Sequence, residues 1–537
     1  MSMRVRADGA RTGRVRAGQI RAGALAAAAV LLTGVVTGCD SVADGASGGP
    51  TSGSGGKNAD PGAGRSAGLP ALPASLTGQK PDWRSCRAPE GGEQPGSQWR
   101  CATVDVPLDY AKPDGETIPI ALIRKEARDR DRRIGSLLFN FGGPGASGVQ
   151  TLPPSADEYR AINQRYDLVG FDPRGVAESA GVVCRDDGEQ ERAEARVDLT
   201  PDTAAEEAAY LKDATDFGAG CARRSGKVLP HVTTTNTARD LDLVRHVLGD
   251  DKLNYFGYSY GTQLGSTYAH LFPKNVGKTV LDAVVDPTAD AKAHARHQTT
   301  GFQRALNNYF TSTGESPEAG TARVARLLER LDRKPLPTSS GRKLTQSLAL
   351  TGIVLPLYSE SSWPYLTSAL EEAESGTGDE LLGLADSYND RDESGRYGTQ
   401  GHSQRAISCA DTSERPTLAD AKGLLPEFRR ISPVFGEFLA WDLAGWCGNW
   451  PVKGEAVTQD VSAPGAGPIL VVGTTGDPAT PYEGAPKMAD GLGDGVGVLI
   501  TNKGEGHGAY GSSACVTRAV DGYLLEGKVP SDGMTCS

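Results

Sequence analysis

The stretch Tyr255–Thr262, which reads YFGYSYGT, contains the pattern G-x-S-x-G with its serine at position 259. The aromatic and apolar residues of Lys252–Phe256 predict a buried strand before it, and the residues as far as Ala269 can form a helix after it. On a tight strand-to-helix turn the serine hydroxyl stands clear of the backbone, and a side chain in place of either glycine would crowd the turn. Glycine is abundant in this chain, with 69 residues, so the pattern predicts a nucleophilic Ser259 only together with partner residues elsewhere.

Two predicted strands near the C-terminus end beside an acid and a histidine. The run Pro468–Gly473 leads to Asp477, and the run Gly497–Thr501 leads to His507, which has glycine on both sides. The alternative is a surface histidine on a loop, but the chain has only seven histidines. The order serine, acid, histidine is that of the α/β-hydrolases, so we expect Ser259, Asp477 and His507 to form a catalytic triad.

Asp286, at the end of the predicted strand Lys278–Val285, is the competing acid. Asp286 lies earlier in the chain than the acid of an α/β-hydrolase usually does. Asp477 lies in a turn directly after a predicted buried strand, which is the better position for an acid that holds a histidine. In the expected reaction Ser259 attacks a carbonyl carbon, and His507 takes the serine proton and later gives it to the leaving group. Asp477 fixes the histidine tautomer and stabilises the imidazolium that forms. These steps need no cofactor.

A glycine-rich loop, Phe141–Gly148 (FGGPGASG), follows the apolar run Ser136–Asn140, which predicts a strand. A loop of this kind can bind phosphate, but this one lacks the G-K-[ST] of a P-loop. A hydrolase needs glycines here so that bare backbone N–H groups can approach the developing oxyanion. We expect the amides of Gly143 and of Tyr260, the residue after the nucleophile, to be the two donors; a plain turn is the alternative.

Strand and helix patterns alternate along much of the chain, which predicts a mostly parallel sheet flanked by helices. After residue 290 helical patterns dominate, and the strand signal returns only at Pro468. The sequence therefore predicts an α/β-hydrolase fold whose core is formed by residues 83–289 and 452–537, with a mainly helical cap formed by residues 290–451. In the turn that follows the predicted strand Tyr166–Phe171, we expect Arg174 to have a structural rather than a catalytic role.

The N-terminus has the pattern of a targeting segment. Six arginines precede the apolar run Ala22–Val36, which is too short for a good spanning helix and ends beside Thr37-Gly38-Cys39. Small residues before a cysteine resemble the lipobox of bacterial lipoproteins, so residues 1–39 predict an exported protein that is acylated at Cys39 and anchored to the membrane. An ordinary secretory signal with a chance cysteine is the alternative. Residues 40–82, rich in Gly, Ser, Ala and Pro, predict a flexible tether.

Eight cysteines remain when Cys39 is set aside, an even number in a compartment that permits disulfides. Eight cysteines allow 105 connectivities, of which pairing between neighbours is the simplest. That pairing joins Cys86 to Cys101, Cys184 to Cys221, Cys409 to Cys447 and Cys515 to Cys536. No C-x-x-C pair is present, which makes a zinc or redox site a poor interpretation, and we expect no bound metal.

The composition of the 537-residue chain, with 38% hydrophobic and 23% charged residues, is ordinary for a globular protein. Its formal net charge of -11 argues against a nucleic-acid partner, because phosphate binding needs a basic face. The negative charge favours solubility and could attract cationic substrates.

Five motifs, NFGGPGASG, GFDPRGVAES, GYSYGT, GTTGDPATP and GEGHGAY, occur in this order. Together they resemble the secreted tripeptidyl aminopeptidases of actinomycetes, which are serine peptidases of the α/β-hydrolase fold related to prolyl aminopeptidases. The resemblance covers the chain from Trp83 to Ser537 and places the triad and the oxyanion hole on the residues given above. One departure is Phe141, where relatives often have proline; this changes the stiffness of the loop and leaves the donors in place.

The resemblance implies an exopeptidase that releases short peptides, tripeptides in particular, from peptide or protein substrates with free N-termini. Such specificity needs an anion that holds the substrate ammonium. Asp411, in the predicted cap, is our candidate, and Glu178 is a second one; a solvated or structural role for Asp411 is the alternative. Three rival functions stay open: an esterase or lipase, a cell-envelope protease of broader specificity, and a surface lipoprotein that binds without catalysis.

Overall fold

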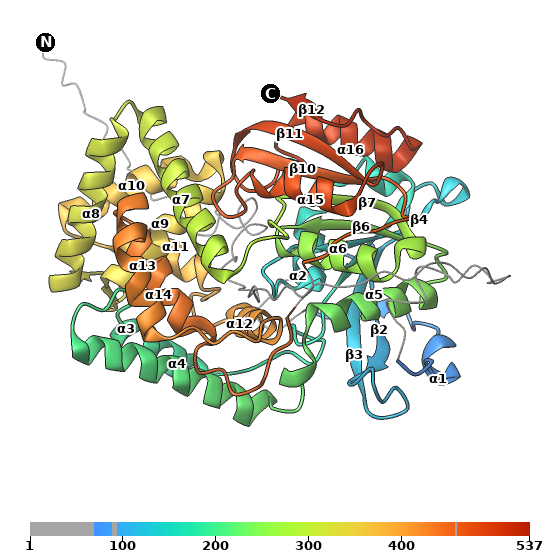
Figure 1. The fold of residues 1–537 in the computed structure, drawn as a ribbon, viewed down its shortest axis with the longest axis horizontal. Coiled ribbons are helices and arrows are strands. Elements are labelled where there is room, and N and C mark those ends of the chain that lie inside the picture. Colours follow the sequence, from blue (N-terminus) through green and yellow to red (C-terminus); the bar gives the residue numbers. More distant parts are fainter. Residues whose placement is uncertain (1–68, 89–93, 457–458) are drawn as a thin grey trace, which may run out of the picture.

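The computed structural model describes residues 69–88, 94–456 and 459–537. The predicted signal segment, Cys39 and most of the predicted tether lie outside the described residues. Within the described residues, no helix combines the length and the apolar character needed to cross a bilayer. Figure 1 shows a sheet with its flanking helices beside a second region that is almost entirely helical.

A ten-stranded sheet forms the core, in the order β1-β2-β3-β5-β4-β6-β7-β10-β11-β12. β1, β2, β3 and β5 pair antiparallel, and every neighbouring pair from β5 to β12 is parallel. The mostly parallel sheet expected from the sequence is therefore confirmed. The strands are β1 (Arg84–Ser85), β2 (Trp99–Pro107), β3 (Thr117–Lys125), β4 (Gly135–Asn140), β5 (Tyr166–Phe171), β6 (Leu253–Tyr258), β7 (Val276–Asp282), β10 (Ile469–Gly476), β11 (Gly497–Glu505) and β12 (Met534–Cys536).

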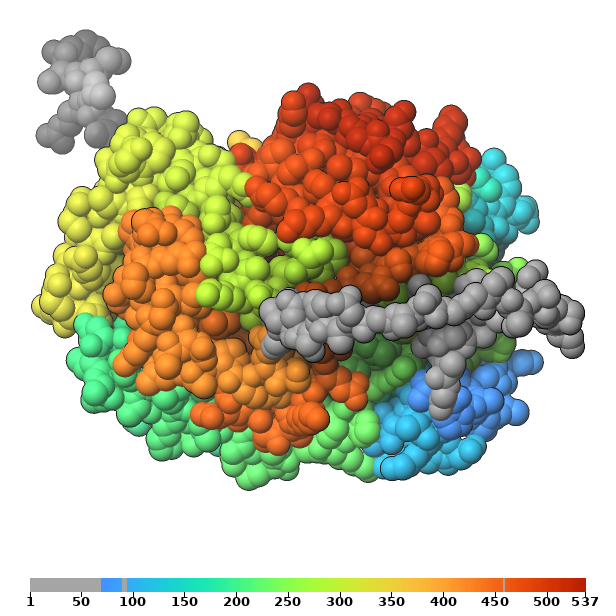
Figure 2. All heavy atoms as spheres, viewed as in Figure 1, coloured from blue at the N-terminus to red at the C-terminus, as the bar shows by residue number. Residues whose placement is uncertain are grey.

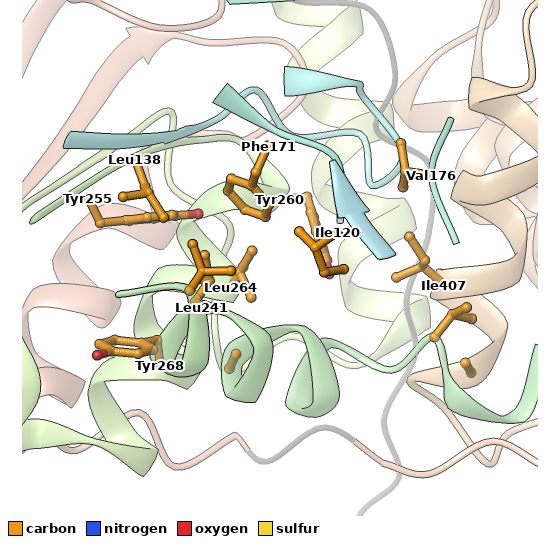
Figure 3. Close-up of a cluster of buried hydrophobic side chains, with 14 of the residues drawn as sticks. Ile120, Leu138, Phe171, Val176, Leu241, Tyr255, Tyr260, Leu264, Tyr268 and Ile407 are labelled. Atoms are coloured by element: carbon orange, nitrogen blue, oxygen red, sulfur yellow. The ribbon is translucent and has the colours of Figure 1, made fainter. Parts of the chain in front are cut away.

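Helices cover both faces of this sheet, which is why β4 and β5 are buried along their whole length. Figure 3 shows Leu138 and Tyr255 of the sheet close to Leu241 and Leu264 of two helices in one buried apolar cluster. On that face lie α5 (Thr234–Val247), α6 (Tyr260–Leu271) and α15 (Gly484–Leu492), and on the other face lie α2 (Gly148–Ser155) and α16 (Ala514–Glu526).

The helical region has a hydrophobic core of its own, built mainly between residues 291 and 443. In the space-filling view, the yellow-green surface of its first long helix lies against the orange-red C-terminal part of the sheet region (Figure 2). The predicted cap is thus present as a helical layer beside the sheet. Its elements are α7 (Ala291–Thr313), α8 (Pro317–Arg333), the hairpin β8 (Leu336–Pro337) and β9 (Lys343–Leu344), α9 (Gln346–Val354), α10 (Trp363–Ser375), α11 (Asp379–Tyr388), α12 (Gln400–Ala410), α13 (Leu418–Ile431) and α14 (Gly436–Cys447).

The helical layer also takes two helices from the predicted core segment 83–289. These are α3 (Asp187–Arg196) and α4 (Ala204–Ser225). Tyr210 of α4 packs its ring against Trp441 of α14 and donates its hydroxyl to the Trp441 carbonyl at 3.0 Å. The predicted boundary at residue 290 therefore leaves α3 and α4 outside the layer they help to build, because a helical pattern does not show which surface the helix will cover.

The predicted tether 40–82 extends too far toward the C-terminus. A short helix, α1 (Ala74–Thr77), places Leu76 in the core with 4% exposure. The side chain of Gln79 accepts from the backbone N–H of Asp105 and donates to its carbonyl, both at 2.8 Å. Order therefore begins before Trp83, because one leucine and one amide side chain suffice to attach this polar stretch to the sheet.

All four predicted disulfides are present: Cys86–Cys101, Cys184–Cys221, Cys409–Cys447 and Cys515–Cys536. The third joins α12 to α14 within the helical layer, as expected for a region tied together by a disulfide. In the chain-entropy model, closing loops of this size stabilises the fold by roughly 3 to 4 kcal/mol each.

The structural role expected of Arg174 is confirmed. Its side chain is fully buried and donates two hydrogen bonds, of 2.6 and 2.7 Å, to the carboxylate of Asp240 on α5. Its remaining donors bind the carbonyl oxygens of Pro107, Leu108 and His231. All of the guanidinium is thus used to join the turn after β5 to its neighbours.

Candidate active site

The serine of the G-x-S-x-G pattern lies between β6 and α6, in the conformation that the sequence predicts. Ser259 has φ 56° and ψ -124°, a positive-φ conformation that a side-chain-bearing residue rarely adopts. A Cβ on Gly257 would lie 2.4 Å from the carbonyl oxygen of Gly261, and a Cβ on Gly261 would lie 2.8 Å from that of Asn140. Both glycines are therefore required by close backbone contacts, and the strand-turn-helix geometry is confirmed.

The acid and the histidine meet at the carboxyl ends of β10 and β11. Nδ1 of His507 lies 2.9 Å from each carboxylate oxygen of Asp477. Asp477 is fully buried and also accepts from the backbone N–H groups of Ala479 at 2.9 Å and Thr480 at 2.8 Å. Because Nδ1–H donates to the carboxylate, Nε2 of the neutral imidazole is left with its lone pair.

The two atoms between which a proton would pass form no hydrogen bond with each other or with any other described residue. Ser259 Oγ and His507 Nε2 are both buried, and neither has a partner among the described residues. The glycine after the histidine, Gly508, has φ 95° and lies against the Tyr258 ring. A Cβ added to Gly508 would lie 3.7 Å from the nearest atom of that ring. The turn that carries His507 thus packs directly on the strand end that carries the serine.

Asp282, the last residue of β7, connects these two turns. Its backbone carbonyl accepts from the N–H of Ser259 at 3.1 Å. Its carboxylate accepts from the backbone N–H of Ala509 at 3.0 Å and of Tyr510 at 2.8 Å. Burial raises the pKa of Asp282 to about 6. Asp282 was not predicted as a site residue from the sequence; the one signal for it is its position at a strand end, four residues before Asp286.

We expect Asp282→Asn to lower kcat by about 10- to 100-fold, because the two loop amides, which both donate to Oδ2, would lose their charged acceptor. KM should change little, since Asp282 is fully buried behind the turn. Steady-state kinetics with a chromogenic amide separate the two constants. Asp521→Asn is the matched control, because Asp521 bonds the Tyr510 hydroxyl at 2.9 Å and leaves the loop amides untouched. An unchanged kcat in Asp282→Asn would contradict the positioning role.

The glycine-rich loop lies directly on the nucleophile. A Cβ on Gly142 would approach within 2.8 Å of the Ser259 Cβ and 3.3 Å of the Tyr260 nitrogen. The Gly142 N–H is already donated to Asn140 Oδ1 at 3.0 Å. The amides of Gly143 and Tyr260 have no partner within the described residues. Because the Gly142 N–H is already bonded, the Gly143 N–H is the better candidate for the oxyanion-hole donor that acts together with the Tyr260 N–H, as the sequence predicts.

Asp286 is engaged elsewhere. Its Oδ2 binds Lys487 Nζ at 2.6 Å, and its Oδ1 accepts from the backbone N–H of Thr288 at 2.9 Å. The competing acid therefore does not reach His507, which is bonded to Asp477.

The two predicted ammonium ligands lie in different settings. Asp411 is 2% exposed and accepts from Thr234 at its backbone N–H (2.8 Å) and its hydroxyl (2.6 Å); that hydroxyl in turn contacts the Tyr260 hydroxyl. Burial raises the pKa of Asp411 to about 7. Glu178 is exposed, in the loop after β5. An ammonium-binding role stays a prediction for both, and the contacts of Asp411 at the start of α5 do not favour it.

Among the described residues, no group of three or more His, Cys, Asp or Glu side chains is placed to hold a metal ion. A strained serine between a strand and a helix, and an acid–histidine pair at two further strand ends of one parallel sheet, define the class of serine hydrolases with the α/β-hydrolase fold.

Comparisons with known proteins agree with this class. A family model described as TAP-like protein matches residues 432–536. The serine protease Hip1 of Mycobacterium tuberculosis is 38% identical over 490 residues, covering 86% of this chain and 91% of that protein. Carboxylesterase B of the same organism is 37% identical over 506 residues, covering 90% and 94%. The tripeptidyl aminopeptidase of Streptomyces lividans is 32% identical over 480 residues, covering 85% and 86%. The chain belongs to this family of TAP-like α/β-hydrolases, and it is an enzyme.

Proposed function

We propose that this chain is a serine exopeptidase that releases short peptides, tripeptides in particular, from substrates with free N-termini. One observation carries the proposal: Asp477 holds Nδ1 of His507, while His507 Nε2 and Ser259 Oγ are both buried without a hydrogen-bond partner among the described residues. A relative named tripeptidyl aminopeptidase, similar over 85% of this chain, supports the substrate class.

In the proposed reaction, Ser259 Oγ attacks the carbonyl carbon of the scissile peptide bond as its proton passes to His507 Nε2. The oxyanion that forms is stabilised by the amides of Gly143 and Tyr260. His507 then gives the proton to the leaving amine, the C–N bond breaks, and an ester to Ser259 remains. Water, deprotonated by His507, hydrolyses that ester and releases the short peptide.

A panel of aminoacyl, dipeptidyl and tripeptidyl chromogenic amides, each free and N-acetylated, tests the proposal. We expect the highest kcat/KM for the free tripeptidyl amide, with a loss of about tenfold or more on acetylation because a charge-assisted contact is removed. Equal cleavage of free and acetylated substrates would reject the aminopeptidase specificity while leaving the hydrolase class intact.

Ester hydrolysis is a second candidate, favoured by the 37% identity to a protein named carboxylesterase B. The same panel, extended with carboxylic esters of matched acyl groups, separates the two. A kcat/KM that is high for esters and negligible for every amide would favour the esterase.

We also propose that the enzyme is exported and anchored to the cell envelope through a lipid on Cys39. The basic and apolar segment before Thr37-Gly38-Cys39 supports this. Fractionation of cells that express the full chain tests it, and recovery of the intact chain in the cytoplasm would contradict it.

A further inference from the structure

The start of α6 lacks the side-chain cap that helices commonly have. Ser259 occupies the N-cap position, but its hydroxyl accepts no hydrogen bond from the first turn. A serine at this position usually accepts from the N–H of the second or third helical residue and so fixes the turn. Here the hydroxyl is the nucleophile. The first helical residue, Tyr260, whose N–H is the second oxyanion donor, is therefore held in place by other contacts.

The Tyr260 side chain is anchored at its far end. The side chain is 3% exposed and belongs to the buried cluster of Figure 3, which also contains Ile407 of α12. Its hydroxyl forms a hydrogen bond with Thr234 Oγ1, at the start of α5. Burial, and after it the charge of Asp411, raises the pKa of Tyr260 well above its usual value. The phenol therefore keeps its proton and can donate it.

Asp411 ends this chain of hydrogen bonds. Its Oδ2 accepts from the Thr234 hydroxyl at 2.6 Å, and its Oδ1 accepts from the Thr234 N–H at 2.8 Å. Because the Thr234 hydroxyl has one proton and gives it to the carboxylate, the Tyr260 hydroxyl is the donor to Thr234 Oγ1. The chain thus runs from Tyr260 through Thr234 to Asp411, and all three side chains are buried. A bond to a carboxylate in such a setting is stronger than one between neutral groups.

One helix of the helical layer contacts both halves of the oxyanion hole. Asp411 directly follows the last residue of α12. At the other end of α12, the carbonyl oxygen of Gln400 would lie only 2.7 Å from a Cβ on Gly145. Gly145 belongs to the glycine-rich loop, two residues after Gly143. α12 therefore packs on the loop of one donor with its first turn and holds the side chain of the other donor, Tyr260, through Asp411.

We propose that Asp411 is a positioning residue of the oxyanion hole: through Thr234 it holds the Tyr260 side chain, and with it the Tyr260 N–H that faces the developing oxyanion. This rests on the acyl-transfer step of the proposed function, which peptide and ester hydrolysis share. A shift of about 1 Å in a group of this kind costs on the order of 100-fold in rate. Asp411 thus acts on kcat through two other residues, in place of the predicted contact with a substrate ammonium group.

Thr234→Val tests the proposal on the full-length enzyme, because valine keeps the shape of threonine and removes only the hydroxyl. We expect kcat for p-nitrophenyl acetate and for a tripeptidyl p-nitroanilide to fall by about 10- to 100-fold, with little change in KM. Thr234→Ser, which keeps the hydroxyl, should recover most of the loss. Thr237→Val is the matched control, since this buried hydroxyl on the same helix only donates to the Thr233 carbonyl at 3.2 Å.

The two ends of the chain are tested in the same assays. Asp411→Ala should show the kcat loss of Thr234→Val, and Asp411→Asn, whose amide oxygen can still accept from Thr234, should recover part of it. Tyr260→Phe removes the phenol hydroxyl and should lower kcat by about tenfold. The double variant Thr234→Val/Tyr260→Phe should lose no more than Thr234→Val, because both changes break one chain. Tyr268→Phe is the control for Tyr260→Phe, because its hydroxyl binds Asp242 at 2.9 Å, away from this chain.

The inhibition constant of an alkyl trifluoromethyl ketone separates positioning from stability. Ser259 Oγ adds to the ketone carbon while the serine proton passes to His507, and the resulting oxyanion occupies the hole. The inhibition constant should therefore rise by the factor by which kcat/KM falls. Variants that lower the thermal midpoint but keep kcat and the inhibition constant within about twofold of the wild type overturn the proposal. If Thr234→Val does not fold, Tyr260→Phe decides by the same criterion.

Two further outcomes keep this proposal apart from the substrate specificity. If Asp411→Asn raises KM for peptides with a free N-terminus alone and leaves ester hydrolysis unchanged, Asp411 binds the substrate ammonium and the positioning role is overturned. If the wild-type enzyme cleaves the ester and no peptide amide, the exopeptidase function is rejected. The ester kinetics and the ketone then decide on Asp411 by themselves.

Discussion

Ser259→Ala is expected to lower kcat by about a million-fold, because the nucleophile is lost while the binding surface and the oxyanion donors remain. Ser259 Oγ has no hydrogen-bond partner among the described residues, so its removal should leave the fold intact. The thermal midpoint and the disulfide content should therefore match those of the wild type. Single-turnover and steady-state assays on an amide substrate measure the loss.

Residual activity in Ser259→Ala that exceeds a few percent of the wild type would reject the assignment of the nucleophile. Ser266→Ala is a matched control about two turns further along the chain, on α6. Its hydroxyl only donates to the Gln263 carbonyl at 3.0 Å, and this variant should retain full kcat.

Asp477→Asn is expected to lower kcat by about 10⁴-fold. The backbone amides of Ala479 and Thr480 donate to Oδ1, so the oxygen of an asparagine would stay with them and its NH₂ group would face His507. Nδ1 would then become the acceptor, and the ring proton would move to Nε2, where it blocks proton transfer from Ser259. The loss should appear in kcat, and the thermal midpoint should change little.

Asp286→Asn is the control for the acid, because the sequence offers Asp286 as the rival. Its carboxylate binds Lys487 and Thr288, away from the histidine. We expect full kcat and a thermal midpoint lowered slightly by the loss of this ion pair. If Asp286→Asn loses most of its kcat while Asp477→Asn stays active, Asp286 and not Asp477 is the acid of the triad.

The parts of this enzyme that the sequence reveals are those encoded by local pattern. Gly257 and Gly261 flank the serine because neighbouring backbone leaves no room for a Cβ. Asp477 and His507 each follow a short apolar strand, and parallel strands bring their carboxyl ends to one edge of the sheet. Strand alternation and residue order were therefore sufficient to predict the fold and to select these three residues.

The parts that the sequence does not reveal depend on contacts between distant segments. Nothing local distinguishes Asp282, which binds two loop amides, from Asp286 four residues later, which binds a lysine. Asp411 lies close to a cysteine in the sequence, which favours it as a candidate, yet its partner in the structure is Thr234, 177 positions away.

The most direct test of the central claim, that His507 and Asp477 activate Ser259 as a nucleophile, is the site and rate of labelling by a fluorophosphonate. Mass spectrometry of the digested adduct should place one equivalent on the peptide that contains Ser259. The labelling rate of Asp477→Asn should fall far below that of the wild type and of Asp286→Asn. An adduct on another residue, or equal labelling rates in all three proteins, would contradict the account.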